Sequence, residues 1–191
     1  MGSLKKENKK AFSSAETTNC SCAAKSTGRQ TTTDDDCAEP QSVNMAQFEN
    51  DFLSAHNAYR KRHGSPPLQL SRELSNSAQQ WANYLLSIRT MKHSGSGYGE
   101  NIYYAYGFKE LKGQQPVDSW YNEIQYYNFS QPGFAMNTGH FTQVVWKDSK
   151  LLGVGVATDG KGLFYCVGQY SPAGNVMSPG YFERNVLPAT A

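Results

Sequence analysis

The chain has 191 residues, a formal net charge of +2 and a hydrophobic fraction of 38%. This length suits one domain with a full core and one tail, and so small a charge gives no reason to expect nucleic acid as a partner. No apolar run in the sequence is long enough to span a bilayer.

The first ten residues carry several lysines but no apolar segment follows them, which argues against an ordinary signal peptide. Cys20, Cys22 and Cys37 all lie within the first 42 residues, so Cys166 is the only cysteine of the remainder. One cysteine cannot form an internal disulfide framework. We therefore expect a reducing, intracellular compartment.

Residues 1–42 are rich in Ser, Thr, Lys, Asp and Asn and almost free of large apolar side chains. Such a segment buries too little surface to offset its chain entropy, so we predict a disordered tail over 1–42 and one folded domain over 43–191. Gly2 is a candidate for myristoylation, although Lys6 stands where the usual signal has Ser or Thr, and Cys20 and Cys22 are candidates for palmitoylation. A solvated leader without a partner is at least as good an interpretation.

Apolar residues at helical spacing predict an amphipathic helix over 44–63 and a second helix over 72–89. A third helix is expected to begin near Pro116, because proline suits a first helical position. Glu123 falls at the edge of the apolar stripe of that third helix. A carboxylate placed there must either form a hydrogen bond or ion pair or remain exposed to solvent.

Thr138 and Gly139 predict a turn that leads into a short element carrying His140. The runs 151–158 and 163–170 predict two strands, and the glycine-containing stretch 159–162 between them predicts a hairpin turn. Helices first and a hairpin later favour an α+β layered fold.

Four side chains are candidates for a polar site because each stands at a turn or a half-buried position: His93, Glu100, Glu123 and His140. Two imidazoles and two carboxylates suit a divalent-metal site, and they suit a proton-transfer site equally well. No pair among them stands three or four residues apart, so their spacing does not decide between these chemistries.

Four stretches, in this order along the chain, resemble the CAP superfamily (cysteine-rich secretory proteins, antigen 5 and pathogenesis-related 1 proteins): 56–60, 99–102, 139–146 and 167–175. The resemblance covers most of residues 45–191. It implies a three-layer α-β-α sandwich, the CAP or SCP fold, with a central cleft. It also implies that His93, Glu100, Glu123 and His140 form the family's cavity tetrad, in which His93 and His140 would hold zinc with Glu100 and Glu123 as supporting ligands.

Within this family the chain is most similar to the Golgi-associated pathogenesis-related branch, on the basis of residues 180–188, the lack of a leader and the lack of core cysteines. Gly168 stands where secreted members carry a cysteine. The resemblance implies an intracellular protein on the cytosolic face of Golgi-like membranes. Extracellular location by unconventional secretion is the alternative.

The leading functional hypothesis is a non-enzymatic module that binds membrane lipid peripherally, with acidic phospholipid, sterol or fatty acid as the ligand class implied by the resemblance. The basic run at Arg60, Lys61 and Arg62 would face an anionic surface, although a solvated helix end explains it equally well. A metal-assisted hydrolase using the same tetrad is one alternative, with Ser94 the nearest hydroxyl by sequence. A protein-interaction module that self-associates as a homodimer is the other.

Overall fold

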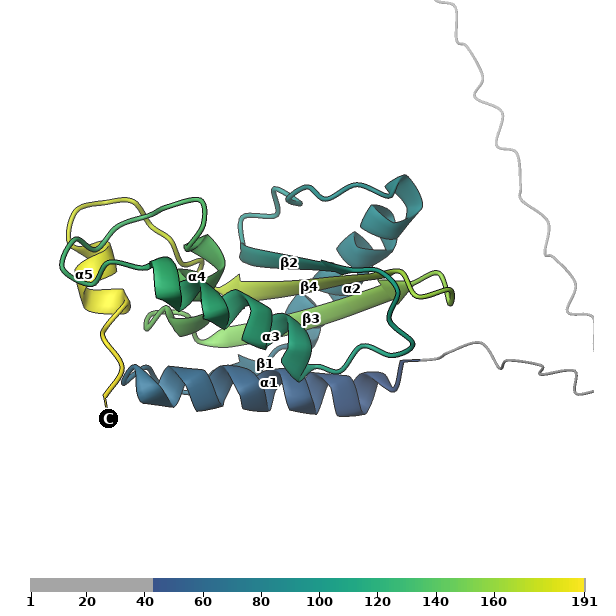
Figure 1. Ribbon diagram of the computed structural model, residues 1–191, viewed down its shortest axis with the longest axis horizontal. Coiled ribbons are helices and arrows are strands. Elements are labelled where there is room, and N and C mark those ends of the chain that lie inside the picture. The colour runs from purple at the N-terminus through teal and green to yellow at the C-terminus, as the bar shows by residue number, and fades with distance from the viewer. Residues whose placement is uncertain (1–42, 191) are drawn as a thin grey trace, which may run out of the picture. The chain divides into compact units, whose positions relative to one another are not determined.

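The computed structural model describes residues 43–190, and the predicted disordered tail over 1–42 lies outside this range. Helices and strands alternate irregularly along the described chain (Figure 1). The helices are α1 (Met45–Arg62), α2 (Arg72–Ile88), α3 (Gln114–Tyr121), the 3-10 helix η1 (Asn122–Tyr126), α4 (Gly139–Val145) and α5 (Tyr181–Asn185). The strands are β1 (Gln69–Leu70), β2 (Gly99–Ala105), β3 (Leu151–Thr158) and β4 (Phe164–Ser171).

The strands form one mixed sheet in the order β1-β3-β4-β2. β3 and β4 make the predicted antiparallel hairpin, β2 pairs antiparallel with β4, and the short β1 pairs parallel with β3. β2 is therefore an edge strand, and it carries Glu100.

Helices cover both faces of this sheet, so the predicted three-layer α-β-α fold is confirmed. One apolar cluster joins α2 to the sheet through residues such as Leu85 and Ile102. A larger cluster joins α1, α3 and α4 to the other face, with Phe52, Trp120 and Phe141 among its members. Figure 1 shows the strands running between these helical layers.

Glycines in β3 allow α2 to lie directly on the sheet. A Cβ atom on Gly153 would overlap the backbone of α2 at Leu74 and Ser75, and one on Gly155 would overlap the backbone at Gln79. The side chain of Gln79 then bonds the strand itself, because its Nε2 donates to the carbonyl of Val156 at 2.8 Å. The close approach of helix and strand thus depends on residues without side chains.

The helix boundaries agree with the predicted ones to within a residue for α1 and α2. Asn44 caps α1 by accepting a hydrogen bond from the backbone N–H of Gln47 at 3.2 Å, and Ser71 caps α2. α3 begins at Gln114, two residues before Pro116. Proline is tolerated there because the first four N–H groups of a helix have no partner within the helix.

Candidate functional site

His93 and Glu100 form the first of two histidine–glutamate pairs. The loop after α2 carries His93, whose Nδ1 donates to Oε1 of Glu100 at 2.9 Å. The same oxygen accepts the backbone N–H of Ser94, and Oε2 accepts Nε2 of Gln169 on β4. The hydrogen bond to Glu100 raises the pKa of His93. Burial alone would raise the pKa of Glu100, but these hydrogen bonds together lower it, so the carboxyl is ionised at neutral pH.

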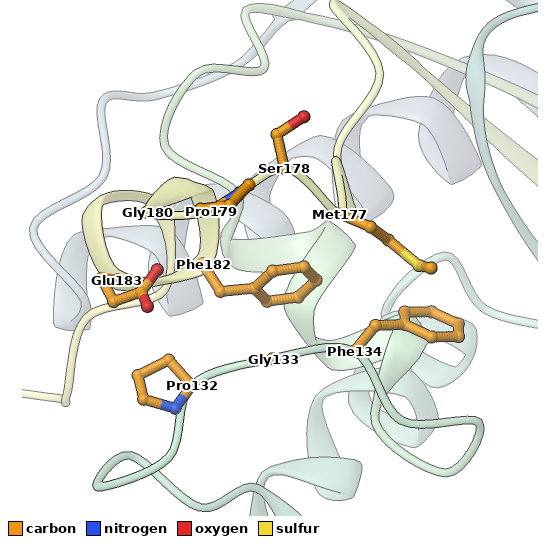
Figure 2. Close-up of a pocket in the computed structure, with 9 residues that line it drawn as sticks. All are labelled: Pro132, Gly133, Phe134, Met177, Ser178, Pro179, Gly180, Phe182 and Glu183. Carbon is orange, nitrogen blue, oxygen red and sulfur yellow. The ribbon is translucent and has the colours of Figure 1, made fainter.

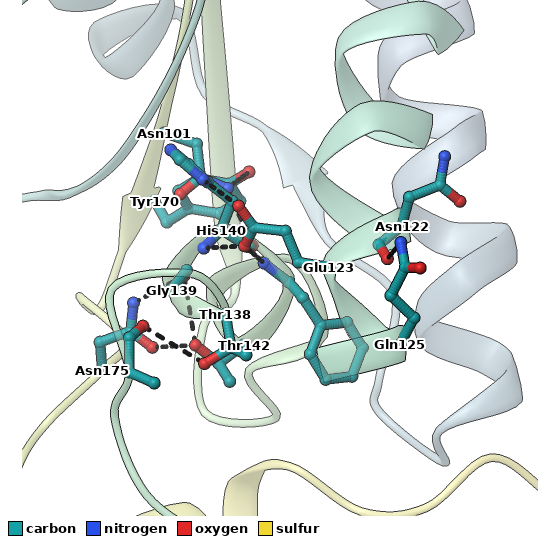
Figure 3. Close-up of polar contacts among 12 residues, drawn as sticks. Asn101, Asn122, Glu123, Gln125, Thr138, Gly139, His140, Thr142, Tyr170 and Asn175 are labelled. Carbon is teal, nitrogen blue, oxygen red and sulfur yellow. Dashed lines mark hydrogen bonds and ion pairs between the residues drawn. The ribbon is translucent and has the colours of Figure 1, made fainter. Parts of the chain in front are cut away.

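Glu123 and His140 form the second pair, drawn in Figure 3. The Nδ1 of His140 donates to Oε1 of Glu123 at 2.7 Å, while Oε2 of Glu123 accepts the backbone N–H groups of His140 and Phe141 at 2.9 and 3.1 Å. Burial would raise the pKa of Glu123, and the bonds from His140 and Phe141 outweigh it and lower that pKa. Glu123, and not the side chain of Thr138, therefore caps the first turn of α4.

A buried polar chain links the second pair to the interior, and the sequence reasoning did not assign it. His56 donates from Nδ1 to the carbonyl of Phe52 at 2.8 Å, so its Nε2 accepts the hydroxyl of Tyr170 at 2.7 Å. Asn101 donates to Tyr170 Oη and to the carbonyl of His140. Burial lowers the pKa of His56 to about 3, so this imidazole stays neutral. These residues lie in the stretches that carry the family resemblance, which was the available signal.

Two further polar side chains in these stretches hold the loop that follows β4. Asn175 donates to the carbonyl of Gly139 at 2.9 Å and accepts the hydroxyl of Thr142 (Figure 3). Gln143, buried on α4, accepts the backbone N–H of Gly174 at 2.9 Å. The loop over 173–175 is thus fixed to α4, and it lines a cavity of about 270 Å³ together with His93 and Glu100.

The structure places the four residues of the predicted cavity tetrad as two pairs, and of these four His93 and Glu100 line the cavity beside the loop over 173–175. Within residues 43–190, no three His, Cys, Asp or Glu side chains are grouped closely enough to hold a metal ion. Each pair nevertheless resembles half of a metal centre, because a carboxylate holds Nδ1 and fixes the tautomer that leaves Nε2 as a lone-pair donor. Glu100 and Asn101 are successive residues of β2, so their side chains point to opposite faces of this edge strand.

The predicted membrane-facing run is wrong at Arg60. This side chain is 0% exposed, and its guanidinium donates to four main-chain carbonyls, at Pro66, Val144, Trp146 and Ser149, over 2.7–3.1 Å. Lys61 and Arg62 are exposed as expected. Arg60 lies on the inner side of α1, where carbonyls at the end of α4 need a donor and water cannot reach.

Ser94 lines the same cavity as His93, but its hydroxyl donates to the Oγ of Ser96 at 3.0 Å. The acylation candidates Gly2, Cys20 and Cys22 lie outside the described residues. Cys166 is buried, and burial raises the pKa of its thiol, as expected for a packed, unpaired cysteine. No helix in residues 43–190 combines the length and apolar character needed to cross a membrane.

Solved structures share this fold. BmVAL-1 superimposes with a TM-score of 0.60 at 25% identity, over 78% of this chain and 86% of that one. NaASP2, crystallised with Zn²⁺, gives a TM-score of 0.59 at 22% identity, over 75% of this chain and 86% of that one. These likenesses support the assignment of the fold.

Curated relatives found by sequence have higher identity to this chain than the two solved structures above. Human Golgi-associated plant pathogenesis-related protein 1 is 48% identical over 146 residues, which cover 74% of this chain and 94% of the human protein. Protein PRY2 of Saccharomyces cerevisiae is 38% identical over 143 residues, covering 74% of this chain but 41% of the yeast protein. The family model for CAP, the cysteine-rich secretory protein family, matches residues 53–170. The chain therefore belongs to the CAP family, among its pathogenesis-related members.

Proposed function

We propose that this chain is a non-enzymatic CAP-domain protein that binds membrane lipid peripherally, through an apolar surface beside α5. The observation that carries the proposal is a cavity of about 280 Å³ lined by two loops, over 132–134 and 177–180, and by Phe182 and Glu183 of α5. Figure 2 shows the side chains of Phe134 and Met177 next to each other, and both line this cavity. Met177 is 74% exposed, and Met136, two residues beyond the first of these loops, is 87% exposed.

This apolar loop surface, defined by Phe134, Met136 and Met177, suits an acyl chain or a sterol ring. Single exposed apolar residues are common, but Phe134 and Met177 line one cavity together, which favours a binding surface. Methionine side chains adapt to irregular apolar partners. Sequence periodicity gave no sign of this surface, because all three residues lie in loops.

Two exposed cations support binding at an anionic membrane. The chain after α5 returns to the end of α1, where Thr190 donates its backbone N–H to the carbonyl of Arg62 at 2.8 Å. Lys61 and Arg62 are therefore near the segment that follows α5. Each cation close to an anionic surface contributes about 1 kcal/mol, which supports weak, reversible attachment. Arg60 is no part of this surface.

Vesicle flotation tests the proposal with anionic vesicles (phosphatidylserine in phosphatidylcholine) and with phosphatidylcholine alone. We expect flotation that increases with anionic lipid and is reduced in Met136→Ser with Met177→Ser and in Lys61→Gln with Arg62→Gln. Tyr126→Ser, a comparable change at an exposed residue of η1, is the matched control. Flotation independent of anionic lipid would contradict membrane attachment by charge, and flotation insensitive to the double Met change would exclude the apolar loop surface.

The proposed location is the cytosolic face of Golgi-like membranes, in line with the name of the human relative. Unconventional secretion is the alternative. Protease digestion of intact, isolated Golgi vesicles separates the two locations. Digestion of the protein before detergent is added supports the cytosolic face, and protection until detergent is added refutes it.

Zinc binding is a second proposal, favoured by the two carboxylate-held imidazoles. His93 and His140 would supply Nε2, and zinc would supply a positive charge and, in a hydrolase, an activated water. Zinc calorimetry on the wild type and on His93→Ala with His140→Ala tests this proposal. One site lost in the double variant supports it, whereas no binding by the wild type leaves the four residues as a polar network.

The hydrolase alternative depends on such a zinc-bound water, since the Ser94 hydroxyl bonds Ser96 and makes no hydrogen bond to His93 in the described chain. Turnover of ester and peptide libraries with zinc added tests the hydrolase alternative, and the absence of turnover would exclude it. Self-association as a homodimer is the remaining alternative, and concentration-dependent sedimentation would reveal it.

A further inference from the structure

A second large cavity, of about 360 Å³, lies where the end of α2, the end of β2 and the β3–β4 hairpin meet. It shares no lining residue with the cavity beside α5 or with the cavity tetrad. Figure 1 places the hairpin tip and α5 at opposite ends of the sheet. Neither the family resemblance nor the proposed lipid surface accounts for this cavity.

Three tyrosines supply its aromatic walls. Tyr104 on β2 and Tyr165 on β4 are opposite each other in the sheet register, with ring centroids 5.4 Å apart in an edge-to-face arrangement. Tyr106, just beyond β2, also lines the cavity and is 71% exposed. Met91 and Leu163 complete the apolar lining. Several aromatic faces around one space favour binding of a quaternary ammonium group, because its methyl groups are apolar and its positive charge is attracted to the faces of the rings.

Two opposite charges line the same cavity. Oδ1 of Asp159 accepts the backbone N–H groups of Lys161 and Leu163 at 2.8 and 3.1 Å, so the carboxylate is held in place by the turn. Oδ2 lies 4.0 Å from Nη2 of Arg89, farther than a direct hydrogen bond. Each group can therefore still bind a ligand group of opposite charge. The two groups are close enough for one small ligand with a charge at each end to reach both.

We propose that this cavity binds a phosphocholine group. The trimethylammonium end would lie among Tyr104, Tyr106 and Tyr165 beside the Asp159 carboxylate, and the phosphate would pair with the Arg89 guanidinium. A lone anion would meet the Asp159 charge, and a lone cation would meet the Arg89 charge. A zwitterion with both ends satisfies both groups, which is why the charge pattern favours it over choline or phosphate alone.

Calorimetric titration of the full chain with phosphocholine tests the proposal without any membrane, so its result is separate from that of vesicle flotation. We expect a dissociation constant of about 1 mM, with choline chloride and inorganic phosphate each at least about tenfold weaker. Tyr106→Ala, Asp159→Asn and Arg89→Gln should each weaken phosphocholine binding by about tenfold. Asparagine keeps an oxygen for the two backbone bonds of the turn, and Tyr126→Ala is the matched control.

Three results would overturn the proposal. These are no binding of phosphocholine at about 20 mM, binding unchanged in both Tyr106→Ala and Asp159→Asn, or choline that binds as tightly as phosphocholine. Circular dichroism of each variant verifies that the domain is folded. If free phosphocholine binds, flotation of Met136→Ser with Met177→Ser on phosphatidylcholine vesicles identifies the source. Flotation lost on adding Tyr106→Ala indicates a lipid headgroup, and no flotation indicates a soluble phosphocholine compound.

Discussion

Replacing Arg60 with methionine should destabilise the domain far more than any other change in the basic run. Arg60 is fully buried and donates four hydrogen bonds to main-chain carbonyls, two of them at Val144 and Trp146 near the end of α4. Burial lowers the pKa of Arg60 to about 10, so the guanidinium is still charged at neutral pH. Methionine is an unbranched apolar side chain that fills part of the same space, but it donates no hydrogen bond to these carbonyls.

The magnitude follows from two opposing terms. Each buried acceptor left without its partner costs about 1–3 kcal/mol. Three of the four carbonyls would lose their donor, because the Trp146 carbonyl also accepts the backbone N–H of Ser149 at 3.2 Å. Removing a buried charge recovers several kcal/mol of desolvation, which offsets part of the loss. We expect a net loss of about 3–5 kcal/mol, a large fraction of the stability of a domain of this size.

Urea unfolding followed by tryptophan fluorescence measures this change. Lys61→Met, the neighbouring exposed cation, is the matched control and should change the unfolding free energy by less than about 0.5 kcal/mol. Arg60→Lys keeps the charge on a single nitrogen that cannot reach all four carbonyls, so it should fall between these values. An Arg60→Met loss below about 1 kcal/mol would refute the assignment of the guanidinium as a structural donor.

Three further predictions concern the core. His56 should stay neutral in the folded state, since burial lowers its pKa to about 3, whereas the unfolded ring titrates near 6.5. Between these pH values the unfolded chain binds one proton more than the folded chain. The free energy of unfolding therefore falls by up to about 1.4 kcal/mol per pH unit as the pH drops from about 6.5 towards 3. A ring that titrates near its ordinary pKa by NMR would contradict this. Gly155→Ala should cost at least about 2 kcal/mol because its Cβ meets the backbone of α2, while Gly133→Ala, with open space around it, should be nearly neutral in the same urea assay. The Cys166 thiol should resist alkylation in the folded protein, as peptide mapping by mass spectrometry would show, and rapid labelling would mean that β4 opens.

Local patterns predicted the elements well and the partners of charged residues poorly. Helical spacing gave α1 and α2, and the run 151–158 coincides with β3, because burial of one face leaves a periodic trace. No sequence pattern predicted that Arg60 would be buried and bonded to main-chain carbonyls. Its acceptors at Val144, Trp146 and Ser149 lie more than eighty residues away, and a basic helix end looks the same whether it faces water or carbonyls.

The candidate site was predictable through the family resemblance and not through spacing. His93 and Glu100 are seven residues apart, and Glu123 and His140 are seventeen apart, so no local rule pairs them. The fold pairs them because β2 lies at the sheet edge beside the loop that carries His93, while η1 lies against α4. The apolar loop surface was missed for a related reason, since exposed loop residues follow no period.

Replacing Glu123 is a poor test of the zinc proposal, because this residue also holds α4 in place. α4 has seven residues, too few to be stable alone, so its position depends on contacts at both ends. Glu123 accepts the first backbone N–H groups of α4, and Arg60 donates to carbonyls at its other end. Loss of zinc binding in Glu123→Ala would therefore follow from a displaced helix as readily as from a missing ligand.

Histidine substitutions avoid this ambiguity. The side chains of His93 and His140 each make one hydrogen bond within the described chain, to the glutamate of their own pair, so replacing them removes a ligand without uncapping α4. Zinc binding that is lost in His140→Gln, in a variant that unfolds at the wild-type urea concentration, would assign the loss to the imidazole. The same binding lost only together with stability would assign it to the helix. The order of these experiments matters because the same carboxylate that would orient a metal ligand already holds the fold.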